Sequence, residues 1–340
     1  MARWVMAVRK ILVPISPAVR FERVVRQAIW LARRCGAELL LLRAGSSTWD
    51  IDDGVPDGVA VTRLAMAGEP VQEIAATARL HNIDLIMMAS HEKWRLGDGF
   101  EADIAFSGFL RQSVVAQIIE KAGCPVWVDT GQGMADAAVQ RPLCYLDLGS
   151  RSAGILAKAG SFAAAIGAKL TLGHATFNTD IHAPGRASPV AGMWQESFAR
   201  TATEKFDALQ RQEGTDASLL IENGDPPRVA PRLVARAEAD LLIVGHWPPR
   251  ERWARGDWGN EESDVHRMIR YARVPVLVFK PAPPLAPRPQ PLSARNRLMA
   301  NLVIALPLIL MLLAMLAMGL EKTRTIHLSA PRWLSTLLGK

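Results

Sequence analysis

The sequence predicts an α/β protein with two parallel β-sheets in tandem, followed by one C-terminal transmembrane helix. Three observations lead to this prediction. Short apolar runs alternate with helical stretches, this pattern occurs twice, and a long uncharged apolar segment lies near the C-terminus. With 340 residues, of which 49% are hydrophobic, the chain is long enough for two domains that each bury a core.

The first copy contains four apolar runs that have the length of β-strands. Isoleucine, leucine and valine follow one another in them almost without interruption, whereas a strand with one solvent-facing side would alternate. Strands buried on both faces indicate a parallel sheet with helices on either side and right-handed crossovers. The predicted strands are residues 11–15, 38–42, 84–88 and 125–128.

The second copy repeats the order of the first. Residues 28–39 align with residues 159–170 at an offset of 131, and both segments read as a helix, a glycine stop and a strand. Further matches join 84–89 to 240–245 at an offset of 156, and 125–128 to 275–278 at an offset of 150. We therefore predict one domain over residues 1–132 and a second over residues 140–280.

The larger offset in the middle of the repeat marks an insertion in the second copy. It falls between the second and third strands, where residues 193–212 predict a helix. The corresponding residues 45–59 of the first copy are rich in aspartate and glycine. We expect the first copy to lack this helix.

Residues 298–320 predict a transmembrane helix. They carry no charge, and Asn301 is their only strongly polar side chain. These 23 residues would reach roughly 35 Å as a helix, enough to cross a hydrocarbon core of about 30 Å. A buried core helix is the alternative, but such helices rarely lack a charge over this length.

The segments on either side of this helix differ in character. Residues 281–297 are rich in proline and predict a semi-extended linker. Residues 321–340 form a tail that we expect across the bilayer from the two domains. Its last ten residues fit a short amphipathic helix on the membrane surface, and a disordered terminus fits them equally well.

The charge distribution argues against nucleic acid as a partner. The net charge is +7, but from Lys280 onwards there are eight basic residues and one acid, which alone give 8 − 1 = +7. The first 279 residues are therefore neutral overall and offer no basic excess for a phosphate backbone.

The cellular compartment is inferred from the cysteines and the N-terminus. The three cysteines show no metal-type spacing and their number is odd, which fits a reducing compartment. The first ten residues contain no apolar signal region. We expect a single-pass protein of the inner membrane with both domains facing the cytoplasm.

The motifs of the two copies resemble those of the universal stress protein family over roughly residues 9–280. The resemblance rests on the order of weak motifs, which occurs twice. The motifs are the opening strand KILVPI at 10–15, the Gly-acid-Pro turns at 68–70 and 224–226, the Asp-Leu-Ile strand at 84–86, and the closing strands CPVWV at 124–128 and VPVLV at 274–278. The resemblance implies a Rossmann-like fold of the adenine-nucleotide alpha-hydrolase type, with five parallel strands in each copy and pairing of the two copies within the chain.

Many members of this family bind ATP, and the resemblance implies where. An aspartate ends the first strand, a Gly-x-x-Gly turn follows the fourth, and a Gly-Ser or Gly-Thr pair starts a later helix, because glycine lets backbone amides approach phosphate. The first copy has lost almost all of this. Its corresponding residues are Ser16, Ala89, Glu92, Gln112 and Ser113. We expect no nucleotide there.

The second copy keeps half of the motif. Asp147, Gly245, His246 and Ser263 stand at motif positions and are the candidate nucleotide-binding residues. Pro248 and Glu262 replace two of the glycines, and both substitutions disfavour phosphate. Two readings stay open: a weakened pocket for ATP or a related nucleotide, or residues that only end strands.

The remaining features point away from catalysis. Residues 247–258 mix tryptophan and arginine, which suits either a docking loop or a loop folded over an empty pocket. The seven histidines show no metal-ligand spacing, and no base with a matched partner can be named. We expect no metal, no cofactor in the first copy and no enzymatic activity.

Three classes of function follow, in order of preference. The first is a regulatory or adaptor protein in the stress response that acts on an inner-membrane protein or the lipid surface. The second is a sensor of ATP or a related nucleotide that uses the second copy. The third is an enzyme of the wider Rossmann-like hydrolase group. Formation of a homo-oligomer is compatible with all three.

Overall fold

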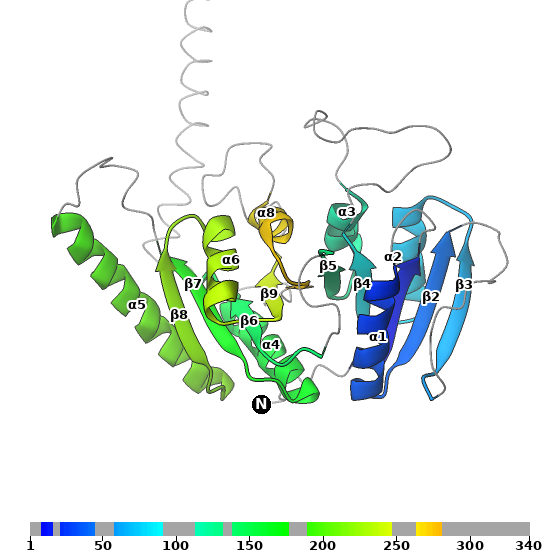
Figure 1. Ribbon diagram of the computed structural model, residues 1–340, viewed down its shortest axis with the longest axis horizontal. Helices are drawn as coiled ribbons and strands as arrows, with labels where there is room; N and C mark the ends of the chain where they lie inside the picture. The colour runs from blue at the N-terminus through cyan, green and yellow to red at the C-terminus, as the bar shows by residue number, and fades with distance from the viewer. Residues whose placement is uncertain are drawn as a thin grey trace, which may run out of the picture. The chain divides into compact units, whose positions relative to one another are not determined.

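The computed structural model describes seven stretches of the chain (Figure 1). They are residues 8–15, 21–44, 58–90, 113–131, 138–176, 189–246 and 263–280. All of them belong to one compact unit, Met1–Ala282. We call the elements from β1 to β5 the first half of the unit and the elements from β6 to β10 the second half.

The first half is a five-stranded parallel sheet with the order β3-β2-β1-β4-β5. Each predicted strand lies within two residues of an observed one, so these predictions are confirmed. The elements are β1 (Lys10–Ile15), α1 (Glu22–Cys35), β2 (Glu38–Ala44), β3 (Val61–Met66), α2 (Pro70–Leu80), β4 (Leu85–Ala89), α3 (Val114–Lys121) and β5 (Val126–Asp129).

The second half has the same strand order, read from the opposite edge of the sheet. Its strands follow one another as β10-β9-β6-β7-β8. The helix expected at 193–212 is present as α5, which is longer at its N-terminal end. The elements are β6 (Pro142–Tyr145), α4 (Ser152–Ile166), β7 (Thr171–Thr176), α5 (Pro189–Glu213), β8 (Ser218–Asn223), α6 (Pro226–Arg236), β9 (Leu241–Gly245), α8 (Asp264–Tyr271) and β10 (Val276–Phe279). Residues 45–57, where the first half was expected to lack such a helix, lie outside the described residues.

The two halves share one sheet. β5 pairs with β10 in antiparallel fashion, with Leu277 opposite Trp127, and this pairing joins ten strands into a continuous sheet. The five parallel strands expected in each copy are present, but the two expected sheets are joined into one. Every other described pairing is parallel. Closing both edges at β5 and β10 removes two unpaired strand edges, which would otherwise offer sites for aggregation.

The core lies on both faces of this sheet because alternate strand residues point to opposite sides. Ile11 and Val13 of β1 belong to one apolar cluster, together with side chains of α1, α4 and α5. Leu12 belongs to the other cluster, which contains side chains of α2, α3, α6 and α8. Each cluster draws residues from both halves.

The predicted helix boundaries are confirmed by the backbone. Gly36 ends α1 and Gly167 ends α4, both in the left-handed conformation that glycine adopts without a side-chain clash. The Gly-acid-Pro turns place an acid at the N-cap and proline in the first turn, with Glu69 before α2 and Asp225 before α6.

The membrane-related predictions fall on residues that the structure does not describe. The linker 281–297, the apolar segment 298–320 and the tail 321–340 all lie outside the described residues. Within the seven described stretches, no helix combines the length and the apolar character needed to cross a membrane.

Candidate functional site

Asp147 follows β6 and organises the turn into α4. Its Oδ1 accepts hydrogen bonds from the Gly149 backbone N–H and from the Ser152 hydroxyl, both at 2.9 Å. A side chain on Gly149 would bring its Cβ to 3.1 Å from this oxygen, so the turn closes tightly around the carboxylate. Ser152 is fully buried in the first turn of α4. The Asp147 carboxylate therefore stabilises this turn, and a nucleoside ligand would have to compete with these two hydrogen bonds for its Oδ1.

Gly245 and His246 lie where β9 ends beside β10. Gly245 is opposite Phe279, and the backbone N–H of His246 donates to the Phe279 carbonyl at 2.8 Å. The His246 side chain is 3% exposed, and its Nε2 lies 3.0 Å from Glu120 Oε1 on α3 of the first half. This contact, foremost as a hydrogen bond, lowers the pKa of Glu120 below its ordinary value. His246 thus faces the other half of the sheet.

Ser263 is the N-cap of α8. Its hydroxyl accepts a hydrogen bond from the His266 backbone N–H at 3.3 Å, which satisfies one of the open amides of the first turn. Ser113 does the same for α3, with the Ala116 N–H at 3.2 Å. Because the first half shares this arrangement, Ser263 by itself does not distinguish a nucleotide site.

Carboxylates gather around the candidate site of the second half. Burial raises the pKa of the Tyr145 hydroxyl, and Asp147, Asp264 and Asp225 raise it further. Arg267 neutralises part of this charge through Asp225 at 2.9 Å and Asp264 at 3.5 Å. Carboxylates at this end of the sheet make it an unfavourable environment for a polyphosphate.

The structure links three of the four candidate residues through His266. The His246 ring stacks on the His266 ring at a centroid distance of 6.0 Å, Gly245 precedes His246, and Ser263 caps the His266 amide. Asp147 belongs to the separate hydrogen-bonded turn before α4. Ser16, Glu92, Gln112, Pro248 and Glu262, and the loop 247–258, lie outside the described residues.

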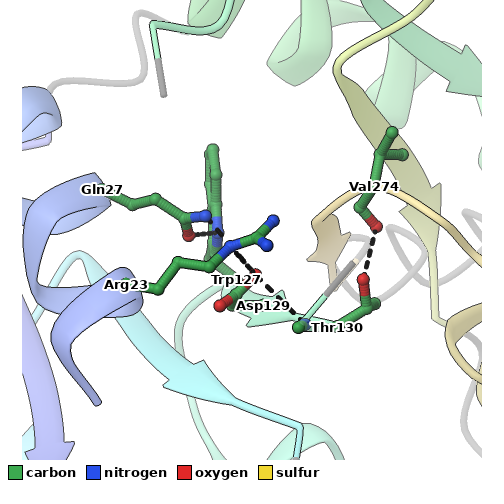
Figure 2. A network of polar contacts seen from close by, with 7 residues as sticks. Arg23, Gln27, Trp127, Asp129, Thr130 and Val274 are labelled. Atoms are coloured by element: carbon green, nitrogen blue, oxygen red, sulfur yellow. Dashed lines mark hydrogen bonds and ion pairs between the residues drawn. The ribbon is translucent and has the colours of Figure 1, made fainter. Parts of the chain in front are cut away.

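A buried polar network in the first half was missed by sequence reasoning (Figure 2). Asp129 ends β5 and is 3% exposed, and its Oδ1 lies 3.0 Å from Arg23 Nε on α1. Gln27 connects this pair to the sheet, because its amide donates to Asp129 at 3.4 Å and accepts from the Trp127 indole at 2.9 Å. The signal in the sequence is the acid that ends the apolar strand VWVD, where the second copy has VLVF.

The same network reaches the second half. Thr130, directly after Asp129, donates from its hydroxyl to the Val274 carbonyl at 3.3 Å (Figure 2). Asp129 Oδ1 also accepts from the Gly131 N–H at 3.4 Å. The network therefore stabilises the end of β5 and its contact with the segment before β10. In the part of the chain that the structure describes, no group of three histidine, cysteine or acidic side chains could hold a metal ion.

Comparison with known proteins finds one family that matches part of the chain. Residues 50–129 match the universal stress protein family. The α/β Rossmann-like sheet described above, dominated by parallel pairings, is the fold of that family.

Solved structures share the fold over most of the chain. A functionally unknown protein from Pseudomonas aeruginosa PAO1 is 19% identical, with a TM-score of 0.58 over 82% of this chain and 94% of that one. A universal stress protein from Archaeoglobus fulgidus is 18% identical, with a TM-score of 0.54 over 82% of this chain and 98% of that one. No curated protein matches the chain significantly.

Proposed function

We propose that this chain is a tandem universal stress protein that acts as a regulatory adaptor on a partner at the inner membrane, without catalysing a reaction. In this model, two universal stress protein repeats form one interaction module. The linker 281–297 and a spanning helix at 298–320 tether that module to the cytoplasmic face of the membrane. The partner is an inner-membrane protein or the lipid surface.

One observation carries the non-catalytic, nucleotide-independent part of the proposal. The side chains at the predicted nucleotide positions already take part in contacts within the chain. Asp147 accepts from Gly149 and Ser152, and His246 faces Glu120. The acids around Tyr145 add a charge that disfavours phosphate. The residues at the carboxyl ends of these strands are thus used in contacts within the chain. We therefore propose that the module acts through contacts of its surface with a partner.

The membrane tether is supported by the sequence. The 23 residues of segment 298–320 are uncharged, and proline-rich residues separate them from the folded unit. The adaptor role needs such a tether because the module itself carries no basic excess that would bring it to anionic lipid.

The first experiment tests the tether. Full-length protein expressed in cells should appear in the membrane fraction and need detergent. A chain ending after Leu292 should be soluble, and its circular dichroism spectrum should be that of a folded α/β protein. A single cysteine at Ser335, in a background without Cys35, Cys124 and Cys144, should react with an impermeant thiol reagent from outside the inner membrane. A full-length chain found in the soluble fraction would refute the tether.

The second experiment separates the adaptor from the nucleotide sensor. Mass spectrometry of the purified full-length protein should detect no retained nucleotide, and calorimetry should detect no ATP binding. Binding that is lost in Asp147→Ala and Ser263→Ala, but not in Ser113→Ala, would instead establish the sensor in the second repeat.

A third experiment tests the partner. Crosslinking in intact cells should capture a membrane protein with the full-length chain but not with the chain ending after Leu292.

A further inference from the structure

Two helix ends receive a cation from the opposite half of the unit. They lie at the joint, by which we mean the contact between the two halves around the β5–β10 pairing. Arg34, in the last turn of α1, donates from its Nε to the Ile166 carbonyl at the end of α4 at 3.0 Å. Lys280, directly after β10, donates to the carbonyls of Glu120 and Ala122 at the end of α3. Each half therefore supplies one cation to a helix of the other half.

A helix end attracts a cation for two reasons. Its last four carbonyls have no partner within the helix, and the helix dipole places partial negative charge there. The last turn of α4 contains no basic residue of its own. Because Arg34 belongs to the last turn of α1 and reaches the last carbonyl of α4, the ends of these two helices meet at the joint. One guanidinium therefore lies at the negative ends of both helices.

The backbone of α4 leaves room for this guanidinium. Gly167 ends the helix, and a side chain there would bring its Cβ to 2.5 Å from Arg34 Nη2. Arg34 itself is an exposed residue, so water screens its contact with the helix end. Lys280 is more enclosed and donates to two carbonyls. We expect the contact of Lys280 to be the stronger of the two.

The aligned positions of the repeat lack both cations. Ala165 aligns with Arg34 at the offset of 131, and Thr130 aligns with Lys280 at the offset of 150. The hydroxyl of Thr130 also reaches across the joint and donates to the Val274 carbonyl, but it is neutral. The joint thus has two pairs of equivalent positions, and in each pair one member is a cation and the other is uncharged.

Two like halves would lose this arrangement. The antiparallel β5–β10 pairing, with the same strand order on either side, relates the halves by an approximate two-fold axis. A like half from a second copy therefore has the strand edge needed to take the place of the partner half. Two first halves would bring two Arg34 guanidiniums to the same helix ends, and two second halves would bring none. Repulsion disfavours the first pairing, and unpaired carbonyls disfavour the second.

We propose that Arg34 and Lys280 are the pairing determinants of the joint. Each supplies a cation to a helix end of the opposite half, and together they fit the joint to two unlike halves. A like half from another copy is rejected because it brings one cation too many or one too few to the meeting ends of α1 and α4. The proposal goes beyond the adaptor function and requires neither the membrane tether nor a partner protein.

Hydrogen–deuterium exchange of the full-length protein tests this selection. The amides of β5 and β10 report opening of the joint, and those of β1 and β2, which pair within the first half, are the reference. Arg34→Ala leaves the meeting helix ends without a cation, as two second halves would. Ala165→Arg gives them two cations, as two first halves would, and Ala165 is exposed, so the added side chain has room. Each variant should raise the relative exchange about threefold, in keeping with an exposed cation at a helix end.

Lys280→Met tests the second determinant. It keeps most of the side chain but removes the ammonium from the end of α3, and the relative exchange of β5 and β10 should rise on the order of tenfold, because a charged donor with two acceptors is lost. Lys121→Met is its control, since Lys121 lies in the last turn of α3 itself and is exposed. An equal effect of the two variants would overturn the role of Lys280.

The decisive test moves the cation across the joint. The double variant Arg34→Ala with Ala165→Arg again provides one guanidinium for the two helix ends, now from α4, and relative exchange should return to that of the unmodified protein. Arg33→Ala is the matched control, because it removes the same charge from the same turn of α1, and it should change nothing. If the double variant exchanges like Arg34→Ala, or if β1 and β2 respond as strongly as β5 and β10, the pairing role is overturned. These results are independent of whether the full-length chain fractionates with membranes, which tests the tether.

Discussion

The two halves of the sheet end their fifth strands in different ways. β5 ends in Asp129, whose carboxylate is buried and held by Arg23 and Gln27. β10 ends in Phe279, which is fully buried, and continues into Lys280. The helix that follows the first strand reaches each of these ends. Gln27 of α1 binds Trp127 and Asp129, and Lys158, the aligned residue of α4, donates to the Lys280 carbonyl at 2.6 Å.

This difference shows how one fold tolerates opposite chemistry at the same place. A polar strand end is stable in the first half because α1 supplies both a cation and an amide to a carboxylate that has left water. The apolar end in the second half needs no such partners, so its α4 is free to hold the chain at Lys280. The ends of β5 and β10 therefore make different contacts, although each strand occupies the same place in its half of the sheet.

The largest expected effect comes from breaking the polar end. Asp129→Ala leaves the Arg23 guanidinium, 16% exposed, without its carboxylate and removes the acceptor of Gln27 and Gly131. We expect the free energy of unfolding to fall by about 3–5 kcal/mol, as for other buried pairs that lose one partner. Urea denaturation of the full-length protein measures this loss.

A double variant tests whether the ion pair is the cause. Arg23→Met with Asp129→Leu makes the first half apolar at this point, as the second half is at Phe279. Most of the lost stability should return, because an apolar pair of similar volume needs no desolvated charge. If the double variant is as unstable as Asp129→Ala, the carboxylate acts chiefly through Gln27 and the turn at Gly131.

A smaller effect is expected at the indole of the same network. Trp127→Phe removes the donor to Gln27, whose side chain is 1% exposed, and leaves a small space beside Phe162. The free energy of unfolding should fall by about 2 kcal/mol, since a buried amide oxygen would be unpaired. Adding Gln27→Leu to Trp127→Phe should restore part of this loss, because it removes the unpaired amide oxygen. A double variant no more stable than Trp127→Phe would show that the lost volume dominates.

Much of the fold could be predicted because its strands are continuous apolar runs. The strand β3 was not among the runs found in the sequence, and its residues Val61–Met66 are only partly buried at the edge of the sheet. An edge strand needs fewer apolar residues and gives a weaker pattern. The β5–β10 pairing could not be predicted either. It joins segments about 150 residues apart, and an apolar strand does not specify which neighbour it takes.

The candidate site was predicted less well, for a physical reason. Motif positions show which residue types are present but not which partner each one meets. Asp147 meets its own turn, and His246 meets a carboxylate of the other half. Asp129 was overlooked because no nucleotide motif includes it. Buried polar networks of this kind depend on long-range contacts, such as that between Gln27 and Trp127, which lie 100 residues apart.

The smallest expected effect is at the two helix caps, where the halves are most alike. Ser113 caps α3 and Ser263 caps α8, with hydrogen bonds of 3.2 Å and 3.3 Å to the amides of Ala116 and His266. Ser113→Ala and Ser263→Ala should each lower the free energy of unfolding by about 1 kcal/mol, the usual cost of losing an N-cap. Paired urea denaturation curves of the two variants measure whether the losses agree. Equal losses would mean that Ser263 is a structural cap like its counterpart. If Ser263→Ala costs clearly more than Ser113→Ala, the excess belongs to the His246–His266 stacking that the α8 cap positions, and it should then shrink in a His266→Gln background. A serine that bound nucleotide would behave differently again, because its replacement would change stability only when ATP is present.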